Sequence, residues 1–197
     1  MSSKKNNLFP VFLKTQQLRV LLVGGGNVAL EKLHALLSNN PFTQITLISP
    51  EIKNEILVLA KEYNIFIIQR KFEIADLNSC ELVLVAINNK TISASIQREA
   101  KKRKILTNVA DTPELCDFYL SSIVQKGHLK IAISTNGQSP TMAKRLKELL
   151  NEALPNELDE LIEKLHEIRN QLTGDFQYKV KTLNKITESL LIEQIPV

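Results

Sequence analysis

The sequence predicts an α/β fold in which helices cover both faces of a doubly wound parallel sheet, followed by a helical segment. Three observations lead to this prediction. Short apolar runs alternate with stretches of helical periodicity over residues 19–110, a glycine-rich turn lies at residues 24–26, and the chain has helical character alone from residue 157. Strands that alternate with helices are joined by crossover connections, which produce a parallel sheet.

The elements of the sheet are expected in order along the chain. The first strand is RVLLV at residues 19–23, and the helix at residues 28–39 carries a single apolar stripe. A strand at residues 44–49 and a helix at residues 51–63 repeat the pattern. The remaining elements are strands at residues 65–69, 80–87 and 105–110 and a helix at residues 93–104. This alternation predicts a doubly wound sheet.

The pattern changes after Asp111. The stretch TPELCDF has a proline and an acidic residue near its start, which is typical of the start of a helix. Residues 128–135 are expected to form one more strand. Ser139 stands where an N-cap is expected, with Pro140 as the first helical residue. From Glu157 apolar residues recur at spacings of three and four, namely Leu158, Leu161, Ile162, Leu165, Ile168 and Leu172. This stripe must be covered, either by the sheet domain or by a second copy of the chain.

Composition narrows the class of protein. The chain has 197 residues, is 44% hydrophobic and 23% charged, and carries a formal net charge of +4, as an ordinary globular protein does. No apolar run could span a bilayer, and residues 1–14 lack the features of a secretory signal, so we expect a cytoplasmic protein without a membrane partner. The chain has no tryptophan and no basic stripe with interleaved aromatic residues, which argues against a nucleic-acid partner.

Cysteine and histidine spacing indicates no metal site. Cys80 and Cys116 have no recognisable pairing pattern, and we expect them to be small buried hydrophobic side chains kept reduced, with a disulfide or a metal pair as the alternative. The histidines, His34, His128 and His166, are far apart in the sequence and distant from the cysteines. No spacing typical of metal ligands is present, so no resident metal is expected.

Gly24, Gly26 and Ala29 form the pattern G-x-G-x-x-A between the first strand and the first helix. Gly24 permits a tight turn, Gly26 leaves room for a pyrophosphate near the backbone, and Ala29 lets the helix pack closely. Asn27 and Val28, at the start of the helix, would offer backbone N–H groups to the phosphates. We therefore predict a dinucleotide site. The alternative is a turn whose glycines serve only the fold.

Further cofactor contacts are expected at neighbouring strand ends. Dinucleotide folds often place an acidic residue after the second strand, where it binds the ribose hydroxyls. Here that strand ends with Ser49, Pro50 and Glu51, and no arginine is present to hold a 2′-phosphate, which favours NAD over NADP as cofactor. Asn88 follows the fourth strand and is expected to line the cofactor cleft, with a plain turn as the alternative.

Three stretches together resemble one enzyme family. They are the glycine turn, NVADTPELCDF at residues 108–118 and IAISTNGQSPTMAKRLKELL at residues 131–150. In their order and spacing they are similar to the precorrin-2 dehydrogenase and sirohydrochlorin ferrochelatase family of sirohaem synthesis. The resemblance begins at LFPVFLK, residues 8–14, and continues to about residue 150.

The resemblance implies an organisation and an activity. The expected parts are a Rossmann-type NAD-binding domain at 1–113, a dimerisation and substrate-side segment at 114–150 and a helical C-terminal domain at 151–197, assembled as a homodimer. The implied reaction oxidises precorrin-2 to sirohydrochlorin with NAD as hydride acceptor. Some members of the family also insert Fe²⁺ into sirohydrochlorin. The alternatives from other classes are a non-catalytic dinucleotide sensor and a tetrapyrrole carrier.

The resemblance also implies roles for individual residues. Asp111 coincides with the family's catalytic aspartate, and a carboxylate at a strand end suits a general base. Without the resemblance, Asp111 would be interpreted as a helix cap, and Asp117 as a solvated helix residue. The residues implied on the substrate side are Ser134, Thr135, Gly137, Ser139, Lys144 and Arg145. For the two basic residues, the alternative is a solvated helix face.

Overall fold

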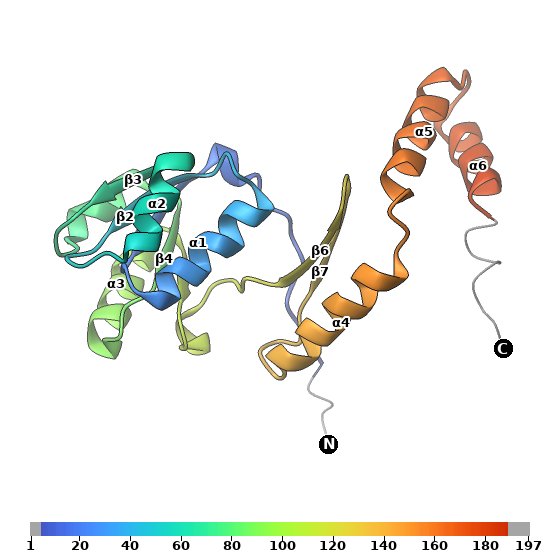
Figure 1. Ribbon diagram of the computed structural model, residues 1–197. Helices are drawn as coiled ribbons and strands as arrows, with labels where there is room; N and C mark the ends of the chain where they lie inside the picture. Colours follow the sequence, from blue (N-terminus) through green and yellow to red (C-terminus); the bar gives the residue numbers. More distant parts are fainter. Residues whose placement is uncertain (1–4, 189–197) are drawn as a thin grey trace. The chain divides into compact units, whose positions relative to one another are not determined.

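The chain folds into two compact units, residues 1–120 and residues 121–197, in the computed structural model shown in Figure 1. The structure describes residues 5–188. The last nine residues of the expected helical C-terminal domain, 189–197, lie outside the described residues. The expected partition into three domains stays a prediction.

The first unit is built on a five-stranded parallel sheet with the strand order β3-β2-β1-β4-β5. Its strands are β1 (Arg19–Val23), β2 (Gln44–Ile48), β3 (Ile65–Ile68), β4 (Leu82–Val85) and β5 (Leu106–Val109). Its helices are α1 (Asn27–Asn39), α2 (Asn54–Glu62) and α3 (Lys90–Lys102), with short 3₁₀ turns η1 (Thr15–Gln17), η2 (Ile74–Ser79) and η3 (Pro113–Leu115). The strand order reverses between β1 and β4, which confirms the doubly wound sheet.

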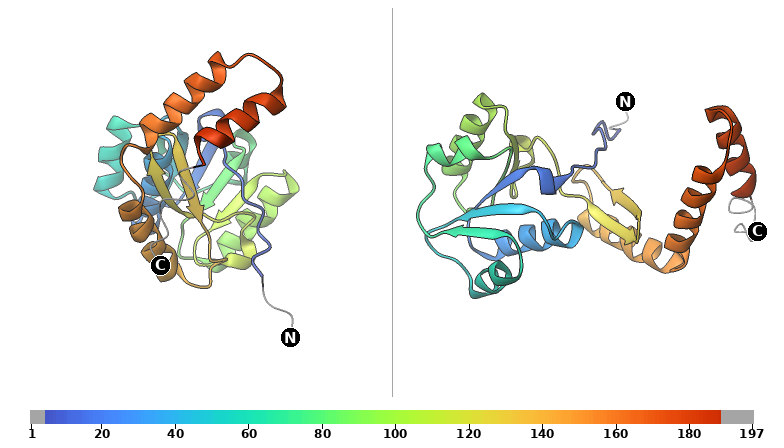
Figure 2. Two further views of the ribbon diagram at one scale, coloured as in Figure 1. Left: turned by 90° about the vertical axis from the view of Figure 1, so that its right-hand side faces the viewer. Right: turned by 90° about the horizontal axis from the view of Figure 1, so that it is seen from above.

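Side chains alternate between two hydrophobic cores on opposite faces of this sheet. Leu22 of β1 and Leu84 of β4 pack with Leu33 of α1 on one face, where α2 also packs. Leu21 of β1 and Val83 of β4 belong to the other core, which includes α3 and η2. Figure 2 shows helices on both faces. Because β1 and β4 are buried on both sides, their ends form a fixed frame for the loops that follow them.

The second unit contains an antiparallel hairpin and three helices. The hairpin pairs β6 (Ser122–Lys126) with β7 (Leu129–Ile133), and the helices are α4 (Pro140–Ala153), α5 (Leu158–Gln171) and α6 (Phe176–Ile186). The Ser139 side chain caps α4 by accepting a hydrogen bond from Met142 N, as the sequence predicts.

The structure differs from the sequence expectations at several places. The stretch TPELCDF forms only the three-residue η3 and not an α-helix. The helix α3 begins at Lys90, three residues before its expected start, because Asn89 caps it by accepting from Ile92 N. The strand β6 was not expected, and the helical tail is divided at Gly174, whose φ of +123° ends any regular helix.

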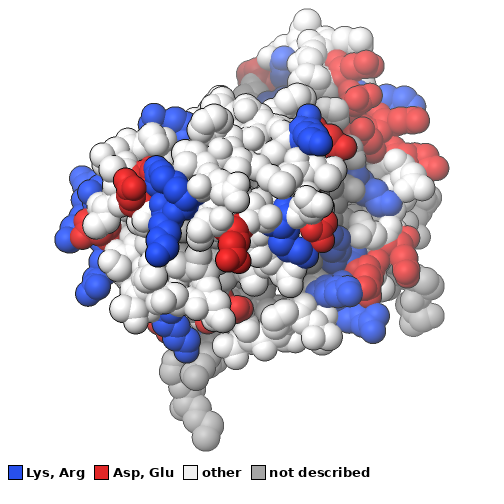
Figure 3. All heavy atoms as spheres, turned by 60° about the vertical axis from the view of Figure 1, so that its left-hand side comes forward, with Lys and Arg blue, Asp and Glu red and all other residues white. Residues whose placement is uncertain are grey.

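None of the helices in residues 5–188 has the length and apolar character needed to cross a membrane. On the face drawn in Figure 3, basic side chains are interspersed with acidic ones.

Candidate functional site

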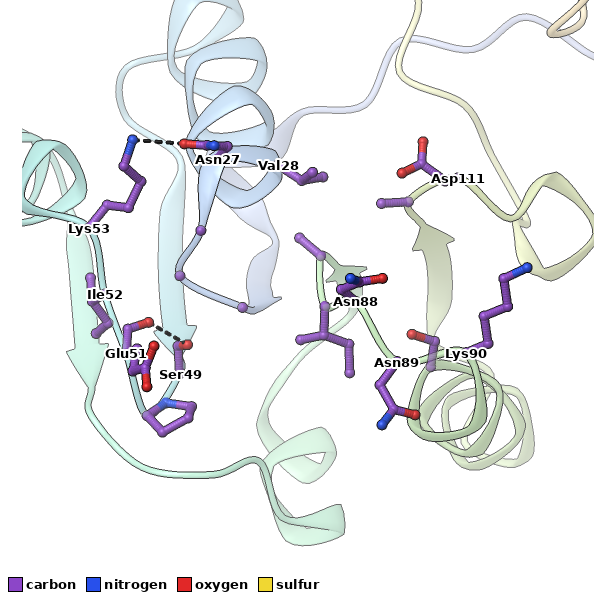
Figure 4. A pocket seen from close by; sticks show the side chains of 18 of the residues that line it. Asn27, Val28, Ser49, Glu51, Ile52, Lys53, Asn88, Asn89, Lys90 and Asp111 are labelled. Carbon is purple, nitrogen blue, oxygen red and sulfur yellow. Dashed lines mark hydrogen bonds between the residues drawn. The ribbon is translucent and has the colours of Figure 1, made fainter.

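A cavity of about 990 Å³ opens at the carboxyl ends of the parallel strands, where the strand order reverses. It is large enough for an extended organic ligand. Four loops contribute its lining, with residues 24–28 after β1, 49–53 after β2, 86–90 after β4 and 110–112 after β5. Figure 4 shows these loops around a common space. Doubly wound sheets bind their ligands at this position.

The first glycine of the turn is required by the backbone. Gly24 has a φ of +123°, and a Cβ at this position would lie 2.3 Å from the carbonyl oxygen of Ala86, just after β4. The same residue donates from its N–H to Ile48 O at 2.9 Å. Gly24 therefore fixes the close approach of the loops that follow β1 and β4.

The second glycine, Gly25, contacts the loop after β2. A Cβ on Gly25 would lie 2.2 Å from the Glu51 carbonyl oxygen, and Gly25 O accepts from Lys53 N at 2.9 Å. This contact holds residues 49–53 beside the glycine turn. Sequence reasoning assigned no role to Gly25, because the middle residue of G-x-G is unrestricted in the general pattern.

Gly26 faces open space, unlike its two neighbours. A Cβ on Gly26 would meet nothing within 4 Å, and its φ of −92° is accessible to any residue. Gly26 is the N-cap of α1, no side chain caps this helix, and its first turn contains no acidic residue. Ala29 is fully buried, which brings α1 against the sheet. The exposed helix N-terminus at the cavity can thus accept an anion.

The loop after β2 places polar groups beside the glycine turn. The Ser49 hydroxyl donates to Glu51 O at 2.7 Å, which fixes the loop, and the exposed Glu51 carboxylate lines the cavity. Lys53 donates from Nζ to Asn27 Oδ1 at 2.7 Å and pairs with Glu55 at 3.0 Å. Figure 4 shows the hydrogen bonds of Ser49 and Lys53 as dashed lines. Sequence reasoning missed Lys53, whose only signal is its place in this loop.

The loop after β4 completes the opposite side of the cavity. Asn88 and Lys90 line it, and Asn89 does so while capping α3. Asn88 thus lies at the cavity, and its role in cofactor binding stays a prediction. Lys90 adds a cationic group that was not expected from the sequence.

Asp111 lies across the cavity from Ser49 and Glu51 (Figure 4). It follows β5 with a φ of +55°, a left-handed conformation that aspartate and asparagine tolerate better than most residues. Thr112, not Asp111, is the N-cap of η3, and the Asp111 carboxylate accepts no hydrogen bond from residues 5–188. The interpretation of Asp111 as a helix cap is therefore wrong. Its carboxylate is exposed at the cavity.

Two neighbours of Asp111 stabilise the fold instead. Asp117 Oδ2 accepts from Thr107 N at 2.9 Å, so this carboxylate satisfies the backbone of the edge strand β5 and is not simply solvated. Cys116 Sγ accepts a hydrogen bond from Val109 N at 3.2 Å, and burial raises the pKa of this thiol. Cys116 is thus a structural side chain in its neutral form.

The residues expected on the substrate side all lie in the second unit. Gly137 has a φ of +74° and open space around its Cβ position, while Thr135 Oγ1 accepts from Ser139 N at 3.1 Å. Arg145 pairs with Glu148 at 2.9 Å, and both Arg145 and Lys144 are exposed along α4. The remaining expected residue is Ser134, whose hydroxyl accepts from Asn136 N.

Two protein families and one solved structure are similar to this chain. Residues 11–122 match the protein family described as "Putative NAD(P)-binding", and residues 126–153 match the family described as "Sirohaem biosynthesis protein central". Among solved structures, one titled "SirC, precorrin-2 dehydrogenase" is similar, with a TM-score of 0.71, 26% identity and coverage of 91% of this chain and 89% of that chain.

The chain is also similar to curated siroheme synthases. The chain is 33% identical over 170 residues to a siroheme synthase of Vesicomyosocius okutanii, covering 86% of this chain and 36% of the relative. It is 33% identical over 177 residues to a siroheme synthase of Psychrobacter cryohalolentis, covering 90% of this chain and 33% of the relative. The chain thus spans about a third of the length of the curated relatives that it matches.

Proposed function

The chain belongs to the family of sirohaem synthase N-terminal modules and SirC-like precorrin-2 dehydrogenases, and we propose that it oxidises precorrin-2 to sirohydrochlorin with NAD⁺. The observation that carries this proposal is a single cavity that combines the glycine turn at the start of α1 with the carboxylate of Asp111. An anion-binding helix start suits the phosphates of a dinucleotide, and a carboxylate at the same cavity can accept a proton.

The cofactor side of the proposal assigns a role to each loop. The backbone from Gly24 to Val28 would hold the pyrophosphate, because this segment has no side-chain cap and leaves space at Gly26. Ser49, Pro50 and Glu51 would lie at the ribose, and Asn88 would line the opposite wall. The Glu51 carboxylate would repel a 2′-phosphate, which supports NAD over NADP.

The chemical role of Asp111 follows from its position. When bound, NAD⁺ supplies the hydride acceptor. Oxidation of precorrin-2 releases one hydride and one proton, so a base must take the proton. Asp111 is an exposed carboxylate at the cavity without a partner among residues 5–188, and it is therefore free to accept that proton.

The second unit would provide the substrate side and the oligomer contact. Precorrin-2 carries many carboxylates, and the α4 N-terminus with Lys144 and Arg145 offers positive charge for them. Met142 and Leu149 of α4 are more than half exposed, which supports assembly as a homodimer that covers such side chains. Insertion of Fe²⁺ as a substrate is a further proposal that rests on the family resemblance alone.

The test is incubation of the chain with precorrin-2 and either NAD⁺ or NADP⁺, followed by absorbance of the reduced nicotinamide and of sirohydrochlorin. We expect stoichiometric formation of both products, with NAD⁺ preferred. Binding of NAD⁺ without turnover would indicate a dinucleotide sensor. Binding of the tetrapyrrole without a requirement for NAD⁺ would indicate a carrier, and either result would contradict the proposal.

A further inference from the structure

In the second unit, the turn between β6 and β7 contacts the first turns of α5 through a histidine and two carboxylates. His128 follows Gly127 in this turn, while Asp159 and Glu163 lie four residues apart on α5 and so share one face of the helix. We propose that His128, Asp159 and Glu163 form a binding site for a divalent first-row transition-metal ion.

The turn is shaped to bring these groups together. Gly127 has a φ of +51°, and a Cβ on it would lie 1.8 Å from the Asp159 carboxyl carbon. Only glycine therefore lets the turn approach the carboxylate this closely. The backbone N–H of His128 donates to Asp159 Oδ1 at 2.6 Å, which fixes the histidine beside α5. Lys126, at the end of β6, donates to Asn156 Oδ1 at 2.8 Å and adds a second contact between the turn and the segment before α5.

The distances suit a shared ion. Zinc binds nitrogen and oxygen ligands at about 2.0–2.2 Å, so neighbouring ligand atoms in tetrahedral or octahedral sites lie about 2.8–3.6 Å apart. His128 Nδ1 lies 2.8 Å from Asp159 Oδ1 and 3.9 Å from Glu163 Oε1. One ligand atom from each of the three residues lies within 4.8 Å of the other two. Glu163 is exposed, so its side chain can turn to bring the carboxylate within this range.

The chemistry of the donors selects the ion. A neutral imidazole and two carboxylates carry a combined charge of −2, which a divalent cation neutralises. Imidazole suits zinc, iron, nickel and copper, whereas magnesium and calcium prefer oxygen ligands alone. The exposure of His128 and Glu163 leaves room for water ligands at the remaining positions.

No sequence pattern indicates this site, because His128 lies 31 residues before Asp159. The residues come together only when the hairpin turn packs on α5. The inference does not rest on the proposed dehydrogenase function, since it concerns ion binding by the second unit alone.

The experiment measures Zn²⁺ binding to the full chain after removal of metals with EDTA, by calorimetry and equilibrium dialysis. We expect one saturable Zn²⁺ site per chain that an excess of Mg²⁺ does not displace. Loss of one coordinating side chain, in His128→Gln or Glu163→Gln, is expected to weaken binding by at least about tenfold. His166→Gln and Glu167→Gln are the matched controls, since these exposed residues lie on the same helix outside the cluster.

Circular dichroism of each variant verifies that the fold is retained. Wild-type affinity in both controls together with the loss in His128→Gln and Glu163→Gln supports the site. The proposal is wrong if the wild-type chain shows no saturable Zn²⁺ binding, or if folded His128→Gln and Glu163→Gln bind Zn²⁺ as the wild type does. The cluster would then be only a hydrogen-bonded contact between the turn and α5.

Discussion

The glycine turn permits a matched pair of substitutions that separates ligand binding from folding. In Gly26→Ala, the new methyl group enters open space at the cavity, and the φ of −92° suits alanine. The fold is therefore retained, with a cost of about 1 kcal/mol or less because alanine is a poorer N-cap than glycine. The methyl group occupies the space that we assign to the pyrophosphate.

The expected loss of affinity follows from the hydrogen bonds that the phosphates would lose. A hydrogen bond to a charged group contributes about 1.5–3 kcal/mol. Displacing the pyrophosphate from one backbone N–H of the turn should thus weaken NAD⁺ binding roughly ten- to hundredfold, since 1.4 kcal/mol corresponds to a factor of ten.

Gly24→Ala should instead destabilise the fold. Its Cβ would lie 2.3 Å from Ala86 O at a φ of +123°, so the fold must shift. The backbone conformation alone costs about 1–3 kcal/mol. Thermal unfolding and NAD⁺ titration of both variants measure the two effects. A folded Gly26→Ala protein with wild-type affinity for NAD⁺ would refute the assignment of the turn.

The oligomeric state, Asp76 and Cys80 each allow a separate test. Light scattering at micromolar concentration should report twice the chain mass, and a monomer would exclude the dimer. The hydrogen bond from Arg70 lowers the pKa of Asp76, so this carboxylate stabilises the fold above its unfolded pKa of about 3.9 and ceases to do so as the pH falls through its lower folded value. Asp76→Asn should therefore lower Tm at pH 7 but have a diminishing effect below about pH 4, and an undiminished effect at low pH would contradict this. Burial raises the pKa of Cys80 to about 11, so iodoacetamide at pH 8 should modify Cys80 about two orders of magnitude more slowly than free cysteine, and a comparable rate would show that the thiol is accessible and ionised.

Local sequence signals were sufficient for the sheet and for the loops that line the cavity at its edge. The strand, glycine turn and helix at residues 19–39 are contiguous, so their pattern shows both structure and chemistry. The residues at the ends of β2, β4 and β5 could be assigned to the cavity because parallel strands bring their carboxyl ends to one edge of the sheet. Asp111 could be placed at the cavity, but its freedom from any capping role became visible only in the structure.

What the sequence missed depends on contacts between distant segments. Lys53 joins the glycine turn through Asn27, 26 residues earlier, and no periodic pattern reports such a pair. Likewise, β6 is only half buried and, within residues 5–188, pairs with β7 alone. It lacks the longer apolar run that marks strands such as β1 and β4. The break between α5 and α6 depends on Gly174, a single residue inside a continuing helical pattern.

The most direct test of the account is the rate of precorrin-2 oxidation by Asp111→Asn. Asparagine has nearly the same shape and also tolerates the left-handed φ of +55°, so the fold and NAD⁺ affinity should be unchanged. Loss of a positioned base is expected to lower the rate by about 10²–10⁴-fold. The account predicts this loss at wild-type Tm and wild-type NAD⁺ affinity. A folded Asp111→Asn protein that oxidises precorrin-2 at the wild-type rate would contradict it.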